Sequence, residues 1–282
     1  MLVLAAVGYG WRRAGVPFER EFVTRLVLNV AGPCLVVETL NDLSVPPAEF
    51  LGMLGASAAL FAVTCLAASA LLASLGKSQR DFLPVLAIGN TGNLGLPLCV
   101  FAFGEEGLAF AVAVYATNSV AQFTFTPVVQ SGVSPLRTLL TTPIVYGALI
   151  GLVILFADID LPQWLDSSIG LLASLLIPLM LIALGNTLAG LHMQRLGSSL
   201  LWGAVRILLG FTVAHTIAWG FGLEGVARGV IILQGSMPAA VFTYLFAARY
   251  NRSPEDIAGI VLSSSVLSAL TLPLLVAYVL SF

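Results

Sequence analysis

Charged residues are scarce in this chain of 282 residues. Asp and Glu total 14 and Lys and Arg total 12, so charged types make up 9% of the sequence. A soluble globular domain carries about 25% charged residues, and a fold with so few cannot cover its surface in water. The shortage excludes a cytosolic enzyme, a nucleic-acid-binding protein with a basic face and a disordered chain.

Residues for metal or covalent chemistry are also few. The three cysteines, Cys34, Cys65 and Cys99, are far apart in apolar surroundings, which predicts packing roles and no disulfide framework. The two histidines are His192 and His215, and the chain has no HExxH or GxGD motif and no serine paired with either histidine by motif. We therefore expect no enzyme, no cofactor and no metal site.

Apolar residues are abundant, at 59% of the chain with a mean hydropathy of +1.01. A helix needs roughly 20 apolar residues to cross a bilayer, and such stretches recur, unlike the ten-residue alternating strands of a membrane barrel. We predict an all-α membrane protein with ten transmembrane helices. Their expected spans are 1–11, 21–41, 48–75, 82–103, 107–130, 138–157, 167–190, 196–222, 226–248 and 255–281. The first would rise only about 16 Å, so it is either a half-span or lacks its beginning.

Basic residues alternate between successive connections. Ten of the twelve Lys and Arg residues follow odd-numbered spans, whereas the other connections are mainly acidic. The positive-inside rule then places the odd connections in the cytoplasm and both termini outside. We expect a multi-pass protein of the plasma membrane, in the manner of a bacterial inner membrane.

Prolines repeat between the two halves of the chain at separations of 141 to 146 residues; the pairs are Pro33 with Pro178, Pro97 with Pro238, and Pro127 with Pro273. Each pair joins one span to the fifth span after it. Because five is odd, the second half must be inserted upside down relative to the first. We predict two inverted five-helix repeats, at residues 1–131 and 138–282.

Two spans are interrupted at mid-depth. Residues 89–97 read GNTGNLGLP and residues 234–238 read QGSMP. Such breaks survive in lipid only where they face protein or a water-filled cavity, although kinks for packing are an alternative. Two breaks in equivalent spans predict that discontinuous helices 4 and 9 cross, with half-helix N-termini that attract an anion. The helix-break residues would be Gly89, Gly92, Gly95, Pro97 and Gly235, and the substrate-binding residues Asn90, Thr91, Asn93, Gln234, Ser236, Met237 and Pro238.

Other polar side chains inside spans are candidates for binding an ion or supporting the site, namely Asn29, Asn118, Gln122, Asn186 and His215. Asn118 and Gln122 are four residues apart and share a helix face, and interhelical hydrogen bonding is their alternative role. His215 is either a proton relay or a neutral histidine bonded to a carbonyl or hydroxyl. Arg206 is expected to snorkel to the cytoplasmic face. No carboxylate lies near either break for H⁺ coupling, and Na⁺ held by amides, hydroxyls and carbonyls remains open.

Residues 89–98, GNTGNLGLPL, resemble the signature of the auxin efflux carrier family, which includes plant PIN-type carriers and bacterial dicarboxylate carriers. The opening GYGWRR at 8–13 and the stretches 237–250 and 263–273 are similar to the same family. The resemblance implies a fold like that of the bile-acid sodium symporters. Spans 1, 2, 6 and 7 would form a scaffold, often dimeric, and spans 3–5 and 8–10 a moving transport domain. It also implies that Asn90 lies at the crossing and Pro238 at the second break. The plant carriers differ in having proline where Gly89 stands and a long loop between the halves.

We therefore expect a secondary transporter of a small organic anion, a mono- or dicarboxylate including auxin-like acids, working by elevator-type alternating access. Its partners would be that anion, the lipid bilayer and a second copy in a homodimer, with no nucleic acid. A sodium-coupled symporter of larger amphipathic anions is the alternative. A channel or sensor is disfavoured because inverted repeats favour alternating access.

Overall fold

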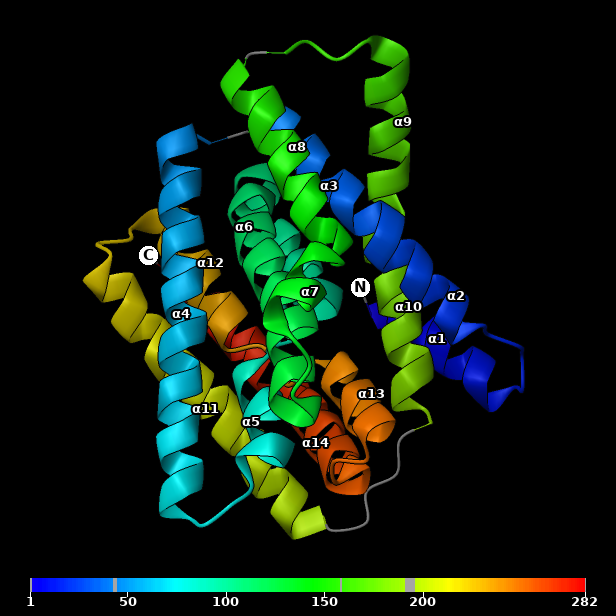
Figure 1. The fold of residues 1–282 in the computed structure, drawn as a ribbon, viewed down its shortest axis with the longest axis vertical. Coiled ribbons are helices and arrows are strands. Elements are labelled where there is room, and N and C mark those ends of the chain that lie inside the picture. The colour runs from blue at the N-terminus through cyan, green and yellow to red at the C-terminus, as the bar shows by residue number, and fades with distance from the viewer. Residues whose placement is uncertain (1, 43–44, 158, 191–195, 282) are drawn as a thin grey trace.

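The computed structural model describes residues 2–42, 45–157, 159–190 and 196–281. These residues form helices and one isolated β-bridge, with no β-strand among them. Figure 1 shows the arrangement. In chain order the helices are α1 (Leu2–Arg13), α2 (Arg20–Leu26), the π-helical η1 (Val27–Ala31), α3 (Gly32–Asn41), α4 (Pro47–Ser74), α5 (Gln79–Ala87), the π-helical η2 (Thr91–Gly95), α6 (Leu96–Ser131), α7 (Pro135–Leu140), α8 (Pro143–Ala157), α9 (Gln163–Ser174), α10 (Leu176–Leu188), α11 (Leu196–Gly220), α12 (Gly225–Gly235), α13 (Val241–Tyr250) and α14 (Pro254–Val279).

Six helical segments of the described residues are long and apolar enough to cross a membrane. They are Glu21–Asn41, Pro47–Ser74, Thr91–Ser131, Gln163–Ala183, Gly197–Gly220 and Pro254–Val279, and two shorter apolar helices are Pro143–Ala157 and Gly225–Gly235. The chain is therefore all-helical and suited to a membrane. The predicted count of ten spans and the inverted repeat stay predictions.

The longest of these segments bends sharply at Gly104, whose φ of 65° and ψ of −147° are open only to glycine. A Cβ on Gly107 would lie 2.8 Å from the carbonyl oxygen of Cys99. In a straight helix, eight residues separate two such positions by about 12 Å. The chain therefore turns back on itself at Gly104, between the predicted spans 82–103 and 107–130.

The helices pack into two sets. In the first set α1 lies along α10, and α3 lies along α8 and α9. In the second set α4 packs on α6 and α11, and α11 packs on α12 and α14. In Figure 1 α9 and α10 stand on the right and α4 and α11 on the left, with α6 between them. The sets meet mainly where α6 touches α3 and α8, and where η2 touches α10.

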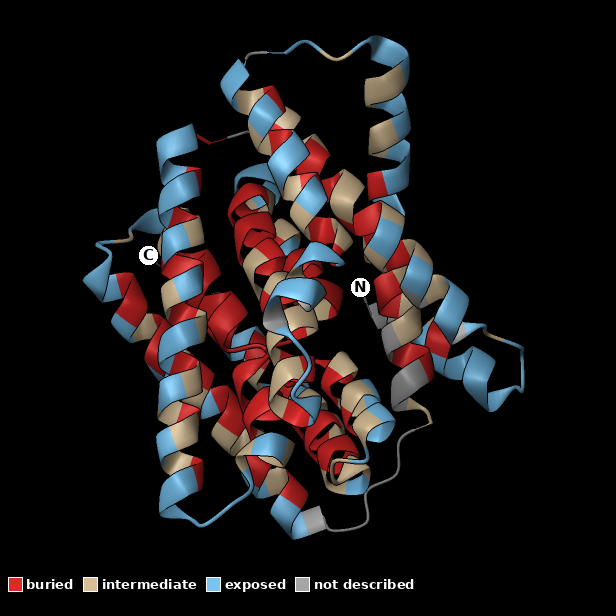
Figure 2. Ribbon diagram, viewed as in Figure 1, coloured by how far each residue is buried: buried red, intermediate tan, exposed pale blue. Residues whose placement is uncertain are grey.

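Large apolar side chains face outward. Trp219 is 86% exposed and Phe101 75% exposed, and Leu66, Leu171 and Leu274 are similarly open. Figure 2 shows exposed residues along the outer faces of α4, α8 and α9, whereas buried residues gather around α6, α12 and α14. In water such faces would be costly, but hydrocarbon suits them. Polar side chains such as Asn90, Gln122 and Gln234 lie buried in the interior instead.

Candidate functional site

The first helix break follows α5. That helix begins at Gln79 and ends at Ala87, and it is capped by Ser78, whose Oγ accepts a hydrogen bond from the backbone N of Asp81 at 3.4 Å. Residues 88–90 are not helical, and the chain re-enters helix through η2 and α6. Pro97 lies in the first turn of α6, where its missing N–H removes no bond within that helix. Glycine and proline thus position the break where the sequence predicts an interruption.

The second break follows α12, which ends at Gly235. Residues 236–240 are not helical, and α13 begins at Val241. A Cβ on Gly235 would lie 2.6 Å from Cβ of Ala214 on α11. The glycine therefore lets the end of α12 approach α11 closely.

The two breaks lie side by side and pair through their backbones. Gly89 and Ala239 form an antiparallel bridge. The backbone N of Asn90 donates to the carbonyl oxygen of Pro238 at 2.8 Å, and the backbone N of Ala240 donates to that of Ile88 at 3.1 Å. Unpaired backbone groups at membrane depth cost several kcal/mol each. Each break therefore supplies hydrogen-bond partners for backbone groups of the other.

Side chains from two long helices complete this junction. Asn118 Nδ2, on α6, donates to the carbonyl oxygen of Gly89 at 2.9 Å and to Thr91 Oγ1 at 3.0 Å. Ser264 Oγ, on α14, accepts from the backbone N of Ala239 at 3.1 Å. The interhelical bonding proposed as the alternative role of Asn118 is thus confirmed.

The broken helices present opposite ends to the two sides of the junction. α5 and α12 end there, so their last carbonyls carry partial negative charge, whereas η2 and α13 begin there with free N–H groups and partial positive charge. One small cavity touches Ala87, Gly89, Gln234 and Gly235 at the C-terminal ends. Another touches residues 90–93 and Ala240 at the N-terminal ends.

We call the second of these the inner chamber. Its volume is about 20 Å³, enough for about one water. Asn90 Nδ2 is buried and has no hydrogen-bond partner among the described residues, so a donor stands ready there. The residues that line it are Leu28, Gly89, Asn90, Thr91, Gly92, Asn93, Tyr115, Asn118, Ser119, Gln122, Phe123, Met180, Ala240 and Phe242.

A much larger outer cavity of about 570 Å³ adjoins the inner chamber. The two share Leu28, Tyr115, Ser119 and Phe123, so the route to the junction passes these side chains. Its other lining residues are Asn29, Pro127, Val133, Ser134, Arg137, Thr141, Thr142, Pro143, Ile144, Phe246, Arg249 and Tyr250.

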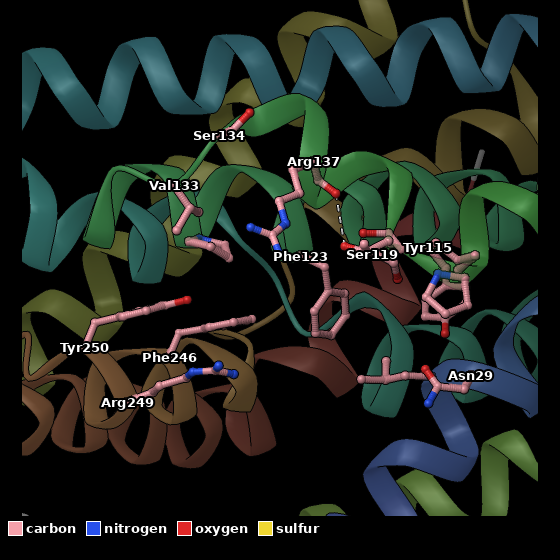
Figure 3. Close-up of a pocket in the computed structure, with 16 residues that line it drawn as sticks. Asn29, Tyr115, Ser119, Phe123, Val133, Ser134, Arg137, Phe246, Arg249 and Tyr250 are labelled. Carbon is pink, nitrogen blue, oxygen red and sulfur yellow. Dashed lines mark hydrogen bonds between the residues drawn. The ribbon is translucent and has the colours of Figure 1, made fainter.

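The outer cavity carries positive charge. Arg137 enters it from α7 and Arg249 borders it from α13, on opposite sides in Figure 3. Among the residues that the structure describes, no Asp or Glu lines it. The Arg249 guanidinium lies 5.8 Å from the ring centre of Tyr250, within cation–π range. Phe123 and Phe246 add apolar walls, so the cavity combines cations with aromatic surface.

The structure brings most of the predicted site residues to these cavities. Asn90, Thr91, Gly92, Asn93, Asn118 and Gln122 line the inner chamber, Gln234 and Gly235 line the small cavity opposite, and Asn29 lines the outer cavity. A Cβ on Gly95 would lie 2.1 Å from Gln234 Oε1, so this glycine makes room for the amide.

Several predicted residues line none of these cavities. Ser236, Met237 and Pro238 belong to the second break and line none of these three cavities, and Ser236 Oγ donates to the carbonyl oxygen of Ile232 at 2.7 Å. Asn186 is buried on α10, where a Cβ on Gly8 would lie 3.0 Å from its backbone N. Asn186 thus belongs to the packing of α1 against α10.

The helix α11 carries two ionisable residues for which the sequence makes a prediction, His215 and Arg206. His215 bonds through Nδ1 to the carbonyl oxygen of Phe211 at 2.9 Å and through Nε2 to Tyr278 Oη at 3.1 Å; these are the contacts expected of the hydrogen-bonded alternative, and its role stays a prediction. The snorkelling expected of Arg206 is wrong, since the residue is only 3% exposed and lines the cavity at the C-terminal ends. The packing of α11 against α4, α12 and α14 keeps its side chain inside the protein. His192 lies outside the described residues.

Sequence reasoning missed Arg137 and Arg249 as site residues. Both are interpreted from the sequence only as cytoplasmic charges, and their common cavity depends on α7 and α13 meeting across more than a hundred residues. The only sequence signal that could have grouped these two arginines is that both follow odd-numbered spans and so lie on the same predicted side of the membrane.

Comparison with known proteins gives three likenesses. A family described as "Membrane transport protein" matches residues 126–276. An uncharacterized transporter of Methanocaldococcus jannaschii is 25% identical over 300 residues, covering 97% of this chain and 95% of that protein. An uncharacterized transporter of Methanothermobacter thermautotrophicus is 27% identical over 295 residues, covering 97% of this chain and 94% of that protein.

Proposed function

The chain belongs to the membrane transport protein family, that of the auxin efflux carriers, and from this premise we propose that it is a secondary transporter of small organic anions. Family and relatives are transporters, not enzymes. Substrate class, coupling and mechanism are the proposed part.

One observation carries the choice of an anion. The outer cavity bears Arg137 and Arg249 without any lining carboxylate, and it adjoins a chamber formed by half-helix N-termini. Clefts of one sign concentrate the opposite charge, and N-terminal N–H groups bind carboxylates. An anion would therefore be attracted at the mouth and held at the junction, with Asn90 Nδ2 as a side-chain donor.

The cavity's size and walls support a small carboxylate. Its volume of about 570 Å³ falls in the range of small-molecule sites. Two guanidinium groups suit a dicarboxylate, and Phe123, Phe246 and Tyr250 suit the ring of an aromatic acid. Mono- and dicarboxylates, auxin-like acids included, are the proposed class.

The packing supports an elevator-type mechanism. The outer cavity is lined from the first helix set by Asn29 and Ile144 and from the second by Ser119 and Phe246, so it lies between the sets. We propose that α1–α3 and α8–α10 are the scaffold, and that the set containing α4–α6 and α11–α14 moves with the junction. Ten spans in inverted repeats, termini outside a plasma membrane and a homodimer through the scaffold belong to this proposal.

Uptake into proteoliposomes tests the proposal. Labelled malate, malonate and an indole acid would be offered to liposomes with and without unlabelled anion inside. We expect saturable uptake that internal anion stimulates, as in a carrier and unlike a channel. Asn90→Ala keeps the backbone bonds of the junction but removes a charge-assisted hydrogen bond, which predicts a loss of about 10- to 100-fold.

Asn41→Ala is the matched control, because Asn41 ends α3 and lines none of the three cavities. This variant loses a hydrogen bond from Nδ2 to Asp166 Oδ1 at 3.1 Å, which joins α3 to α9 within the first helix set. It should transport like the parent protein. Equal uptake by Asn90→Ala and the parent would contradict the assigned site, and uptake that is linear in concentration would contradict a carrier.

A further inference from the structure

Arg206 is a cation buried in the second helix set. It lies on α11, only 3% exposed, and its Nε is buried without a hydrogen-bond partner among the described residues. An arginine at membrane depth is costly and normally has a functional reason. No Asp or Glu of the described part of the chain lines the cavity that Arg206 faces, so pairing with a carboxylate in this cavity does not explain the buried charge.

The guanidinium lies at the C-terminal ends of both broken helices. The point where Gly210 would carry Cβ is 2.0 Å from the carbonyl oxygen of Gly235 and 2.8 Å from Arg206 Nη1. These two atoms are therefore no more than about 5 Å apart, close enough to attract strongly in a low dielectric. At the first break, a Cβ on Gly89 would lie 2.4 Å from Arg206 Nη2.

The surroundings favour positive charge. Each helix C-terminus is equivalent to about half a negative charge, and α5 and α12 both end here. The cavity beside the guanidinium has a volume of about 20 Å³, and Thr91, Asn118 and Gln234 also line it. The side chains of these three residues offer oxygen atoms to a cation, and the Arg206 guanidinium lies beside them in the same cavity.

Transporters with broken helices use the two kinds of end differently. The N-terminal ends face anionic groups of the substrate, and the C-terminal ends and unwound carbonyls coordinate the coupling cation. In this chain a side chain supplies the cation. A Na⁺ ion beside Arg206 would be repelled by the like charge and would find room for only about one water.

We propose that the Arg206 guanidinium is a built-in cation of the junction, standing where a coupling ion would otherwise bind, so that this chain transports its anion without Na⁺. The statement that transport needs no Na⁺ rests on the proposed function, whereas the statement that the guanidinium occupies the position of a cation does not. It disfavours the sodium-coupled symporter considered from the sequence.

The same charge also acts on the anion. The cavity at Arg206 and the inner chamber share Gly89, Thr91 and Asn118, so they lie back to back across the first break. The guanidinium thus strengthens the positive potential of the inner chamber from behind, without touching the substrate. Arg206 therefore acts on the bound anion through the electrostatic potential of the inner chamber and not by direct contact.

Cation dependence is the first test. Purified protein should show no saturable binding of ²²Na⁺, and its uptake of labelled malate should agree within about twofold in sodium, potassium and choline media. Saturable ²²Na⁺ binding, or stimulation of uptake by sodium of about tenfold or more, would overturn the inference.

Chemical rescue is the second test. Arg206→Ala should lower uptake at least about tenfold and lower the melting temperature in detergent. Guanidinium at millimolar concentration should restore part of both, because it fits the vacated space and carries the charge. Urea has nearly the same shape without the charge and should restore neither. Equal rescue by urea would show that the charge has no role.

Two further variants keep the outcomes distinct. Arg206→Lys retains the charge and should stay independent of sodium with uptake closer to the parent than Arg206→Ala. Arg80→Ala removes an exposed arginine of α5 that lines none of the three cavities, and it should change neither uptake nor melting temperature.

If the parent protein transports no anion but guanidinium alone restabilises Arg206→Ala, the proposed function fails and the built-in cation stands. If Arg206→Ala does not fold, sodium binding to the parent decides.

Discussion

Replacing Gly210 by alanine probes the closest approach in the junction. Gly210 is one turn beyond Arg206 on α11, and its Cβ would lie 2.0 Å from the carbonyl oxygen of Gly235. The obstacle is backbone at the end of α12, so no side-chain rotation relieves it. Ordinary contact requires α11 and α12 to separate by more than about 1 Å, in an interior that is closely packed.

The expected cost follows from that displacement. Overpacking of a filled core costs about 1–3 kcal/mol, which for a chain of this size lowers the melting temperature by about 2–5 °C. The same Cβ would lie 2.8 Å from Arg206 Nη1. Transport per folded molecule should therefore fall as well, because the guanidinium is pushed from its place.

Tryptophan fluorescence during heating in detergent measures the first effect, since Trp202 of the same helix is buried. Uptake into proteoliposomes measures the second. Gly220→Ala is the matched control, because a Cβ at the end of α11 meets nothing within 4 Å and alanine favours the helix by up to about 1 kcal/mol. A Gly210→Ala protein that melts and transports like the parent would refute the described approach of α11 to α12.

Two other perturbations test the cavity and the junction. Arg137→Ala and Arg249→Ala should each raise the half-saturating anion concentration about 3- to 10-fold, mostly at low salt, because exposed charges attract through solvent. Arg80→Ala is the control and should leave that concentration unchanged. Kinetics equal to the parent in both cavity variants would contradict an anion-attracting mouth of the outer cavity. Asn118→Ala removes the donor to the carbonyl oxygen of Gly89 and to Thr91, so it should cost about 1–3 kcal/mol, read as a lower melting temperature. Asn118→Asp has no N–H to donate and should rescue little, whereas unchanged melting in both variants would argue against this bond.

The positions of the two breaks could be predicted because their cause is local. Glycine and proline weaken a helix wherever they lie, and the stretches at 89–97 and 234–238 concentrate them. The overall class follows equally directly from the shortage of charge. Composition and local pattern therefore suffice for an all-helical membrane protein with two interrupted helices.

The partners of the breaks could not be predicted, because they come from distant segments. Asn118 reaches Gly89 only because the chain turns back at Gly104. Arg206 is near enough to one end of its span for snorkelling to be reasonable, and its burial depends on how α11 crosses α12. Arg249 reaches the same cavity as Arg137 only through tertiary packing. Such contacts are set by the fold as a whole and leave no periodic signal in the sequence.

The bridge between Gly89 and Ala239 uses only backbone atoms, and this bears on how related chains diverge. Substitutions other than proline at Asn90 or Ala240 change the lining of the inner chamber, yet they leave both hydrogen bonds of the bridge in place. Gly89 has less room, because a Cβ there would lie 2.4 Å from Nη2 of Arg206, so a side chain at this position requires the guanidinium to move. The backbone joint can therefore be inherited unchanged while the side chains around it drift during evolution.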